Sequence, residues 1–229
     1  MQAPPPLLQH LARVPGMGPG RRRLVVLLSQ LGDFDSLEYA QALAAALPQL
    51  QAAGMGLLAI GIGEEAGADR FCDFTGLPRE LLQVEPTPRL HLALGLNPGL
   101  QAPGGPWPSL LLMCAGVGSP GTLAEVFRGY TGDRSAPQRL DSPLFATVGE
   151  GFQRPFELAT VRLRNMVEVL GHWRTYVPRD DFLTQRGATY LLEADDSLLY
   201  SFADRGLLGF SATMARPLSF LDPYLAVAG

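Results

Sequence analysis

The chain has 229 residues, of which 47% are hydrophobic and 17% charged, and these proportions exclude a disordered chain. The formal net charge of -4 argues against a nucleic-acid-binding protein, because such proteins normally present a basic surface. All 18 basic residues are arginine, so mechanisms that need a lysine, such as a Schiff base or a phosphate-binding P-loop, are excluded.

Cysteine and histidine usage predicts a protein without a metal or another cofactor. Cys72 and Cys114 are too few for a disulfide framework or a four-cysteine zinc site. The three histidines have no spacing typical of metal ligands. No apolar run approaches the roughly 20 residues that cross a bilayer. Residues 1–20 also lack the pattern of a signal peptide, so we expect a cytoplasmic protein without a transmembrane segment.

The first predicted strands and helix follow a flexible N-terminal segment. Residues 1–20 are rich in proline and glycine and predict a flexible N-terminal arm, while 21–229 are interpreted as a single domain. Residues 24–28 form a short apolar run, typical of a strand buried on both faces. Between 37 and 50, apolar residues recur at intervals of three and four, which predicts a helix. A second apolar run at 57–62 completes a βαβ unit with parallel strands.

The remaining pattern predicts a helix, a strand and a hairpin. A short helix is expected over 66–75, and a third strand over 81–84. Residues 188–192 and 198–202 flank a polar turn, which indicates an antiparallel β-hairpin. The segment of about 97–183 between these parts is interpreted as an insertion.

The insertion is predicted to be mostly helical. Ser119 and Pro120 provide an N-cap and a first-turn proline for a helix that ends near Gly129. Pro155 opens a second helix of about four turns, for which Gly171 provides the C-terminal stop. These helices would lie between the βαβ unit and the C-terminal β-hairpin.

This order of elements is that of the thioredoxin fold, and several phrases of the sequence sharpen the comparison. Residues 24–50, 71–78 and 186–192 resemble the alkyl hydroperoxide reductase/thiol-specific antioxidant (AhpC/TSA) family in its peroxiredoxin-like branch. Residues 119–122 and 128–134 resemble cyanobacterial and chloroplast members of that branch. The resemblance implies an α/β, thioredoxin-like fold with a mostly helical insertion before the C-terminal β-hairpin.

The resemblance also implies where a catalytic cysteine should lie. In the family it lies at the N-terminus of the helix after the first strand, where backbone N–H groups and the helix dipole lower the thiol pKa. Depending on the register, the matching residues are Asp33, Asp35 or Ser36, and none of them can form a sulfenic acid. Glu38 matches a glutamate common in the family, and Arg186 matches an arginine that precedes the first strand of the hairpin.

Two interpretations of this degenerate site remain open. In the first, the Arg186 guanidinium pairs with Asp35 or Asp33, a carboxylate standing in the place of the thiolate. In the second, the aspartates only cap the helix and Arg186 lies on the surface.

The functional prediction is a binding or regulatory protein of redox or photosynthetic physiology rather than a catalyst. One alternative is a thiol-dependent antioxidant oxidoreductase that uses Cys72 or Cys114, although burial is common for free cysteines and raises the thiol pKa. A second alternative is a dinucleotide-binding loop, because Gly116, Gly118 and Gly121 match the pattern G-x-G-x-x-G.

The insertion also contains a candidate surface for a protein partner. Arginine and aromatic residues are favoured anchors at protein interfaces. Such residues are clustered at Arg162, Arg164, Trp173, Arg174 and Tyr176. The alternative is a helix that carries its arginines on a solvated face. The sequence does not identify the partner.

Overall fold

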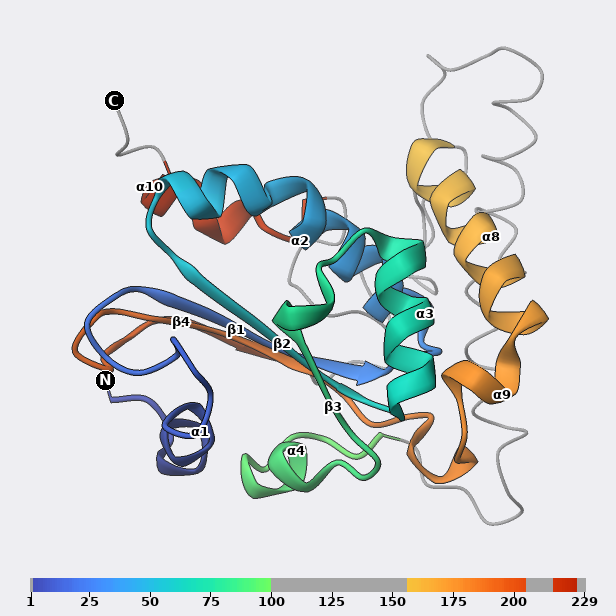
Figure 1. The fold of residues 1–229 in the computed structure, drawn as a ribbon, viewed down its shortest axis with the longest axis horizontal. Coiled ribbons are helices and arrows are strands. Elements are labelled where there is room, and N and C mark those ends of the chain that lie inside the picture. Colours follow the sequence, from blue (N-terminus) through green and yellow to red (C-terminus); the bar gives the residue numbers. More distant parts are fainter. Residues whose placement is uncertain (1, 100–155, 205–215, 226–229) are drawn as a thin grey trace, which may run out of the picture.

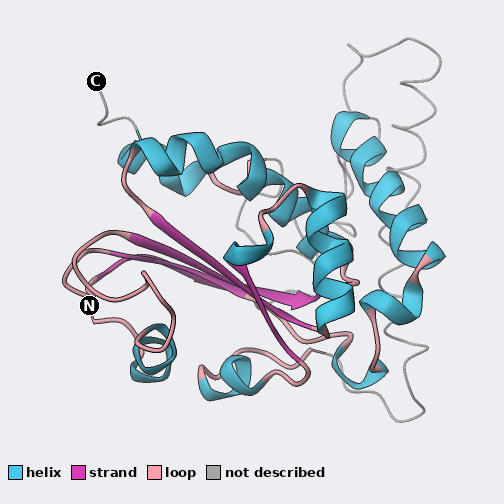
Figure 2. Cartoon of the chain, viewed as in Figure 1, coloured by secondary structure: helices cyan, strands magenta, loops and turns pink. Residues whose placement is uncertain are grey.

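The computed structural model describes residues 2–99, 156–204 and 216–225, and these form a sheet with helices on both faces (Figures 1 and 2). The strands are β1 (Arg23–Gln30), β2 (Gly56–Ile62), β3 (Leu82–Glu85), β4 (Ala188–Leu192) and β5 (Leu198–Ala203). The α-helices are α1 (Pro5–Leu11), α2 (Phe34–Ala52), α3 (Glu65–Thr75), α4 (Arg89–Ala93), α8 (Phe156–Gly171), α9 (Trp173–Tyr176) and α10 (Asp222–Leu225). The short 3₁₀ helices are η1 (Arg79–Leu81), η2 (Asp180–Phe182) and η3 (Ser219–Leu221).

The sheet has the strand order β3-β2-β1-β4-β5. Strands β1, β2 and β3 are parallel, whereas β4 is antiparallel to both β1 and β5. The predicted βαβ unit, third strand and hairpin are therefore confirmed; β1, β2 and β5 are longer than predicted, and β3 is shifted by one residue. The α/β, thioredoxin-like fold class is confirmed with them.

The two faces of the sheet bury two separate hydrophobic clusters. Leu24 and Val26 face the larger cluster, which is covered by α2, α3 and the C-terminal segment. Val25 and Leu27 face the smaller cluster, which is covered by α1 and α4. The alternation follows from the period of two along a strand. Figure 1 shows α1 and α4 on one side of the sheet and α2 and α3 on the other.

The N-terminal residues are not the loose arm that the sequence predicts. Leu7 and Leu11 of α1 are at most 1% exposed, because their spacing of four places them on one helix face that packs against the sheet. The backbone N–H of Ala3 donates to the carbonyl oxygen of Asp196, at 3.1 Å, and that of Gly20 donates to Ala194, at 2.8 Å. The segment is thus attached to the turn of the β4-β5 hairpin.

Arg23, the first residue of β1, also joins the N-terminal segment to the turn of the β4-β5 hairpin. Its side chain is 1% exposed, and its guanidinium donates to the carbonyl oxygens of Met17, at 3.2 Å, and Glu193, at 2.8 Å. It also forms an ion pair of 2.6 Å with the carboxylate of Asp196. Neighbouring Arg22 pairs with Glu193 at 2.9 Å, but that pair lies about one third exposed.

Helices α8 and α9 confirm the helical character of the described part of the insertion. The amide groups of Asn165 and Gln41 exchange two hydrogen bonds, of 2.9 and 3.2 Å, between α8 and α2. Glu168 accepts hydrogen bonds from Arg70 of α3, at 2.6 Å, and from Tyr176 of α9, at 2.9 Å. The predicted helix that ends near Gly129 lies outside the described residues. None of the helices in the described ranges is long and apolar enough to cross a membrane.

The adjacent arginines provide a matched test of the attachment of the N-terminal segment. We expect Arg23→Gln to lower the free energy of unfolding by about 3 kcal/mol, because it leaves buried carbonyl groups without donors and breaks an ion pair. We expect Arg22→Gln to cost less than about 1 kcal/mol, because its ion pair is exposed to solvent. Urea denaturation of both variants measures the difference, and equal costs would contradict it.

Glu168 provides a pH-dependent test of the attachment of α8. Burial raises the pKa of Glu168, but the hydrogen bonds from Arg70 and Tyr176 outweigh it, so the folded-state pKa lies below the usual value. Its stabilisation is therefore present above the usual carboxyl pKa and is lost as pH falls through the folded-state pKa. We expect Glu168→Gln to cost about 1–2 kcal/mol at pH 7.

The difference between this variant and the wild type should shrink as the pH falls below about 4, where the carboxylate becomes protonated in both states. Asp180→Asn is the control, because Asp180 pairs with Arg174, whose side chain is 70% exposed. A cost for Glu168→Gln that stays constant with pH would show that the charge of Glu168 is irrelevant.

Candidate functional site

The candidate residues meet at the edge of the sheet where β1 ends. The parallel strand β1 ends there at Gln30 and the antiparallel strand β4 begins there, since Ala188 pairs with Leu27. The segment before α2 and the segment before β4 therefore share this edge. Gly32 allows the close approach of the insertion, because a Cβ atom at this position would lie 2.3 Å from the Val177 side chain.

The N-terminus of α2 brings together four candidate residues. Asp33 is the N-cap residue, with an extended backbone, but its side chain makes no capping hydrogen bond. Asp35 and Ser36 in the first turn are 1% and 0% exposed, and Glu38 in the second turn is 8% exposed. The first backbone N–H groups of a helix and its dipole stabilise negative charge at such a position. The arrangement is thus suited to carboxylates.

Arg186 reaches the same edge but pairs with a different carboxylate. It is 6% exposed, and its Nη1 lies 3.9 Å from Oδ2 of Asp204. Among the described residues, no ion pair joins Arg186 to Asp33 or Asp35, so the predicted pairing is not formed. The alternative that Arg186 lies on the surface is also wrong. At 3.9 Å the contact with Asp204 is an ion pair and not a hydrogen bond.

Asp204 is the residue that sequence reasoning missed. The backbone N–H of Asp204 donates to the carbonyl oxygen of Gly187 at 3.1 Å, directly after the pairing of Ala203 with Ala188. The register of the hairpin therefore places the Asp204 carboxylate beside Arg186. The available signal was an acidic residue at the end of the second predicted strand, opposite the arginine that precedes the first.

A buried pair of hydroxyl groups joins α2 to β4 near the candidate residues. Tyr39 of α2 and Thr189 of β4 are at most 1% exposed, and their hydroxyl oxygens lie 3.0 Å apart. Burial raises the pKa of Tyr39, so this phenol stays protonated at neutral pH. The pair fixes α2 against β4 without adding a charge.

His91 supports the end of β1 from the opposite face of the sheet. The imidazole is fully buried, and its Nε2 donates to the carbonyl oxygen of Leu28 at 2.7 Å. Burial lowers the pKa of His91, so the ring is neutral at pH 7. Its Nε2 is occupied by the backbone of β1, and the ring serves as a structural support there. No group of three or more acidic, histidine or cysteine residues in the described ranges could hold a metal ion.

Cys72 does not have the environment of a reactive thiol. It lies in the second half of α3, away from the helix N-terminus, and is 6% exposed. Burial raises the pKa of its thiol to about 11. Cys114 and the glycine pattern at Gly116, Gly118 and Gly121 lie outside the described residues.

The predicted partner surface is only partly exposed. Tyr176 is fully buried, and its hydroxyl is bonded to Glu168, so it cannot be part of such a surface. Trp173 is half-buried against the larger hydrophobic cluster. Arg164 lies over the ring of Phe74, and Arg174 is 70% exposed. The side chain of Arg162 lies outside the described part of the structure.

The pKa of Cys72 leads to a labelling experiment. At pH 7 the raised pKa leaves far less of the Cys72 thiol ionised than of free cysteine, of which a few per cent is thiolate. We expect the Cys114→Ser variant to react with a thiol reagent at least a hundredfold more slowly when folded than when unfolded in urea. Equal rates in the two states at pH 7 would contradict the buried, un-ionised thiol. The Cys72→Ser variant reports Cys114 in the same way.

Comparison with known proteins identifies the family. The family model described as AhpC/TSA antioxidant enzyme matches residues 42–206, which is more than half of the chain. The match begins inside α2 and includes α3, β3 and the β4-β5 hairpin, whereas β1 and the first turn of α2 lie before it. No curated protein and no solved structure matches the chain. The extent of the family match and the thioredoxin-like order of the strands agree, and the chain belongs to the AhpC/TSA family.

Proposed function

We propose that this peroxiredoxin-like protein lacks the peroxidatic cysteine and is a non-catalytic binding or regulatory protein of redox or photosynthetic physiology in the cytoplasm. One observation carries the proposal. The first turn of α2, where the family resemblance places the cysteine, instead contains the buried residues Asp35 and Ser36, directly after Asp33.

The chemistry of these residues supports the loss of peroxidase activity. A peroxide is reduced when a thiolate attacks it and becomes a sulfenic acid, a step that neither a carboxylate nor a hydroxyl can perform. Activation of Ser36 would need a neighbouring base. The imidazole of His91 is not available as that base, because it is hydrogen-bonded to the Leu28 carbonyl on the opposite face of the sheet.

The surroundings of the helix N-terminus support a binding role. The residues Arg186, Asp204, Tyr39 and Thr189 are all at most 6% exposed and are held by contacts across α2, β4 and the end of β5. Burial restricts the conformations of these side chains, and a preorganised support favours recognition because little side-chain entropy is lost on binding.

The partner surface that we propose is narrower than the one predicted from sequence. Arg164 and Arg174 remain exposed on α8 and α9. Val167 and Leu170, at 65% and 45% exposed, lie on the same outer side of α8 and add apolar area. An arginine-bordered apolar helix face is a common composition for a protein interface.

A peroxide-consumption assay with a thiol donor tests the proposal. We expect the wild type, Cys72→Ser and Cys114→Ser to consume hydrogen peroxide at the protein-free rate, with an active peroxiredoxin as the positive control. Turnover in the wild type that either substitution abolishes would overturn the proposal and establish the thiol-dependent oxidoreductase as the function. Turnover that survives both substitutions would overturn it as well, because it would require a nucleophile other than a thiol.

Mass spectrometry after treatment with dilute peroxide gives an independent result. We expect neither a sulfenic acid on either cysteine nor a disulfide between Cys72 and Cys114. The appearance of either product within the time of one enzymatic turnover of the control would contradict a non-catalytic protein.

A further inference from the structure

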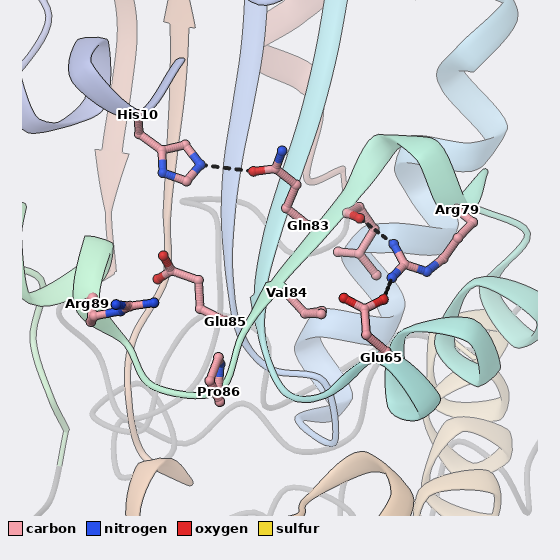
Figure 3. Close-up of a pocket in the computed structure, with 9 residues that line it drawn as sticks. His10, Glu65, Arg79, Gln83, Val84, Glu85, Pro86 and Arg89 are labelled. Atoms are coloured by element: carbon pink, nitrogen blue, oxygen red, sulfur yellow. Dashed lines mark hydrogen bonds and ion pairs between the residues drawn. The ribbon is translucent and has the colours of Figure 1, made fainter. Parts of the chain in front are cut away.

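A pocket lies at the β3 edge of the sheet, and none of its lining residues belongs to the candidate site at the N-terminus of α2. It has a volume of about 350 Å³ and is lined by residues of α1, α3, η1, β3 and the start of α4. Figure 3 shows His10, Glu85 and Arg89 on one side of β3 and Glu65 and Arg79 on the other. The volume is at the lower end of the range for small-molecule sites.

The floor of this pocket offers a single backbone donor and acceptor. Gly63 donates to the carbonyl oxygen of Glu85 at 2.9 Å, and the parallel register pairs Val84 with Gly61. Alternate residues of a parallel strand point their backbone groups to opposite sides. The N–H and C=O of Val84 therefore point away from β2, toward the pocket.

The strand cannot accept another long strand at this edge. The N–H of Leu82 donates to the carbonyl oxygen of Arg79, and the carbonyl oxygen of Leu82 accepts from Arg79 Nη1 at 2.6 Å. Pro86 after the strand has no N–H to donate. Only the backbone groups of Val84 remain between these two blocks, so an occupant must be short.

The two ends of the pocket differ in charge. At one end the Arg79 guanidinium bonds with both Glu65 and Asp69, so two carboxylates share one cation and leave a net negative charge. At the other end the Arg89 side chain is exposed and its guanidinium makes no hydrogen bond or ion pair with a described residue. The Glu85 carboxylate on the same side accepts from the backbone N–H of Leu90 at 3.3 Å, so this end has no net charge whereas the first end is net negative. This polarity fits a ligand with a cation at one end and an anion at the other.

We propose that this pocket binds a short peptide of two or three residues with both termini free. The peptide carboxylate pairs with Arg89, its amide bonds with the N–H and C=O of Val84, and its amino group faces Glu65. Arginine is well suited to the carboxylate because its planar guanidinium can form two parallel hydrogen bonds with it. The half-buried aliphatic side chain of Val84 provides apolar contact for the peptide side chains.

Isothermal titration calorimetry with the dipeptide Ala-Ala tests the site. We expect saturable binding to the wild-type chain with Kd of about 1 mM or lower. Arg89→Gln should weaken binding about tenfold, because it removes a charge-assisted pair. Val84→Pro should also weaken it, because it removes the outward N–H without removing a hydrogen bond to β2. Circular dichroism confirms that each variant is folded.

Ala-Ala with an amidated C-terminus tests directly whether the peptide carboxylate pairs with Arg89. Amidation should weaken binding to the wild type about tenfold and should have little further effect on Arg89→Gln, because the partner of the carboxylate is already absent. Arg216→Gln is the matched control, since Arg216 is 72% exposed in the C-terminal segment and pairs with Asp222. It should bind Ala-Ala like the wild type.

Three outcomes would overturn the proposal. The first is that Ala-Ala at about ten times the expected Kd of about 1 mM does not saturate the wild-type chain. The second is that Arg89→Gln and Arg216→Gln weaken the binding of Ala-Ala equally. The third is that amidation of the peptide weakens binding to Arg89→Gln as much as it weakens binding to the wild type. The site does not depend on the proposed loss of the peroxidatic cysteine, so peroxide turnover would leave this result unchanged.

Discussion

The structure depends on one strand, β1, whose eight residues are all buried and whose two edges are both paired. Water reaches neither face of this strand, so alternate side chains must find apolar partners in both layers of helices. Leu24 and Val26 do so under α2, and Val25 and Leu27 do so over α1 and α4. Because burial of each such side chain contributes about 1.5–3 kcal/mol, the position of β1 determines where every layer packs.

The two ends of β1 have different consequences. At its beginning, the buried guanidinium of Arg23 donates hydrogen bonds to carbonyl oxygens of the N-terminal segment and of the β4-β5 turn, and so attaches both to this end of the strand. At its end, the chain turns at Gly32 and begins α2, so the positive end of a 19-residue helix points at the edge where β4 starts. The amide of Gln30 donates to the carbonyl oxygen of Arg179 at 2.5 Å and attaches the insertion there. The beginning of β1 is thus structural, whereas acidic and basic side chains are buried together at its end.

The sequence predicts the features that depend on neighbours along the chain and misses those that depend on register. Periodicity and turn residues were sufficient for the βαβ unit, for α8 and for the hairpin, because each is specified within its own segment. Leu7 and Leu11 share one helix face, but only the presence of the smaller hydrophobic cluster shows that this face is buried. The partner of Arg186 required the pairing of Ala203 with Ala188, since this register and not proximity in sequence brings Asp204 into reach.

Under the proposed function, the fold of the family persists at the N-terminus of α2 while the residue at the reactive position differs. A helix N-terminus stabilises any anion, so it favours an aspartate as readily as a thiolate. The two anions differ in how they respond to pH and to oxidants. A carboxylate is inert to peroxide, whereas a thiolate forms reversibly with pH and is consumed by oxidation. Under the proposed function, Asp33 and Asp35 stand where the thiolate would lie and cannot perform its redox chemistry. The fold therefore specifies where negative charge is placed, and the residue type alone decides whether that charge can react.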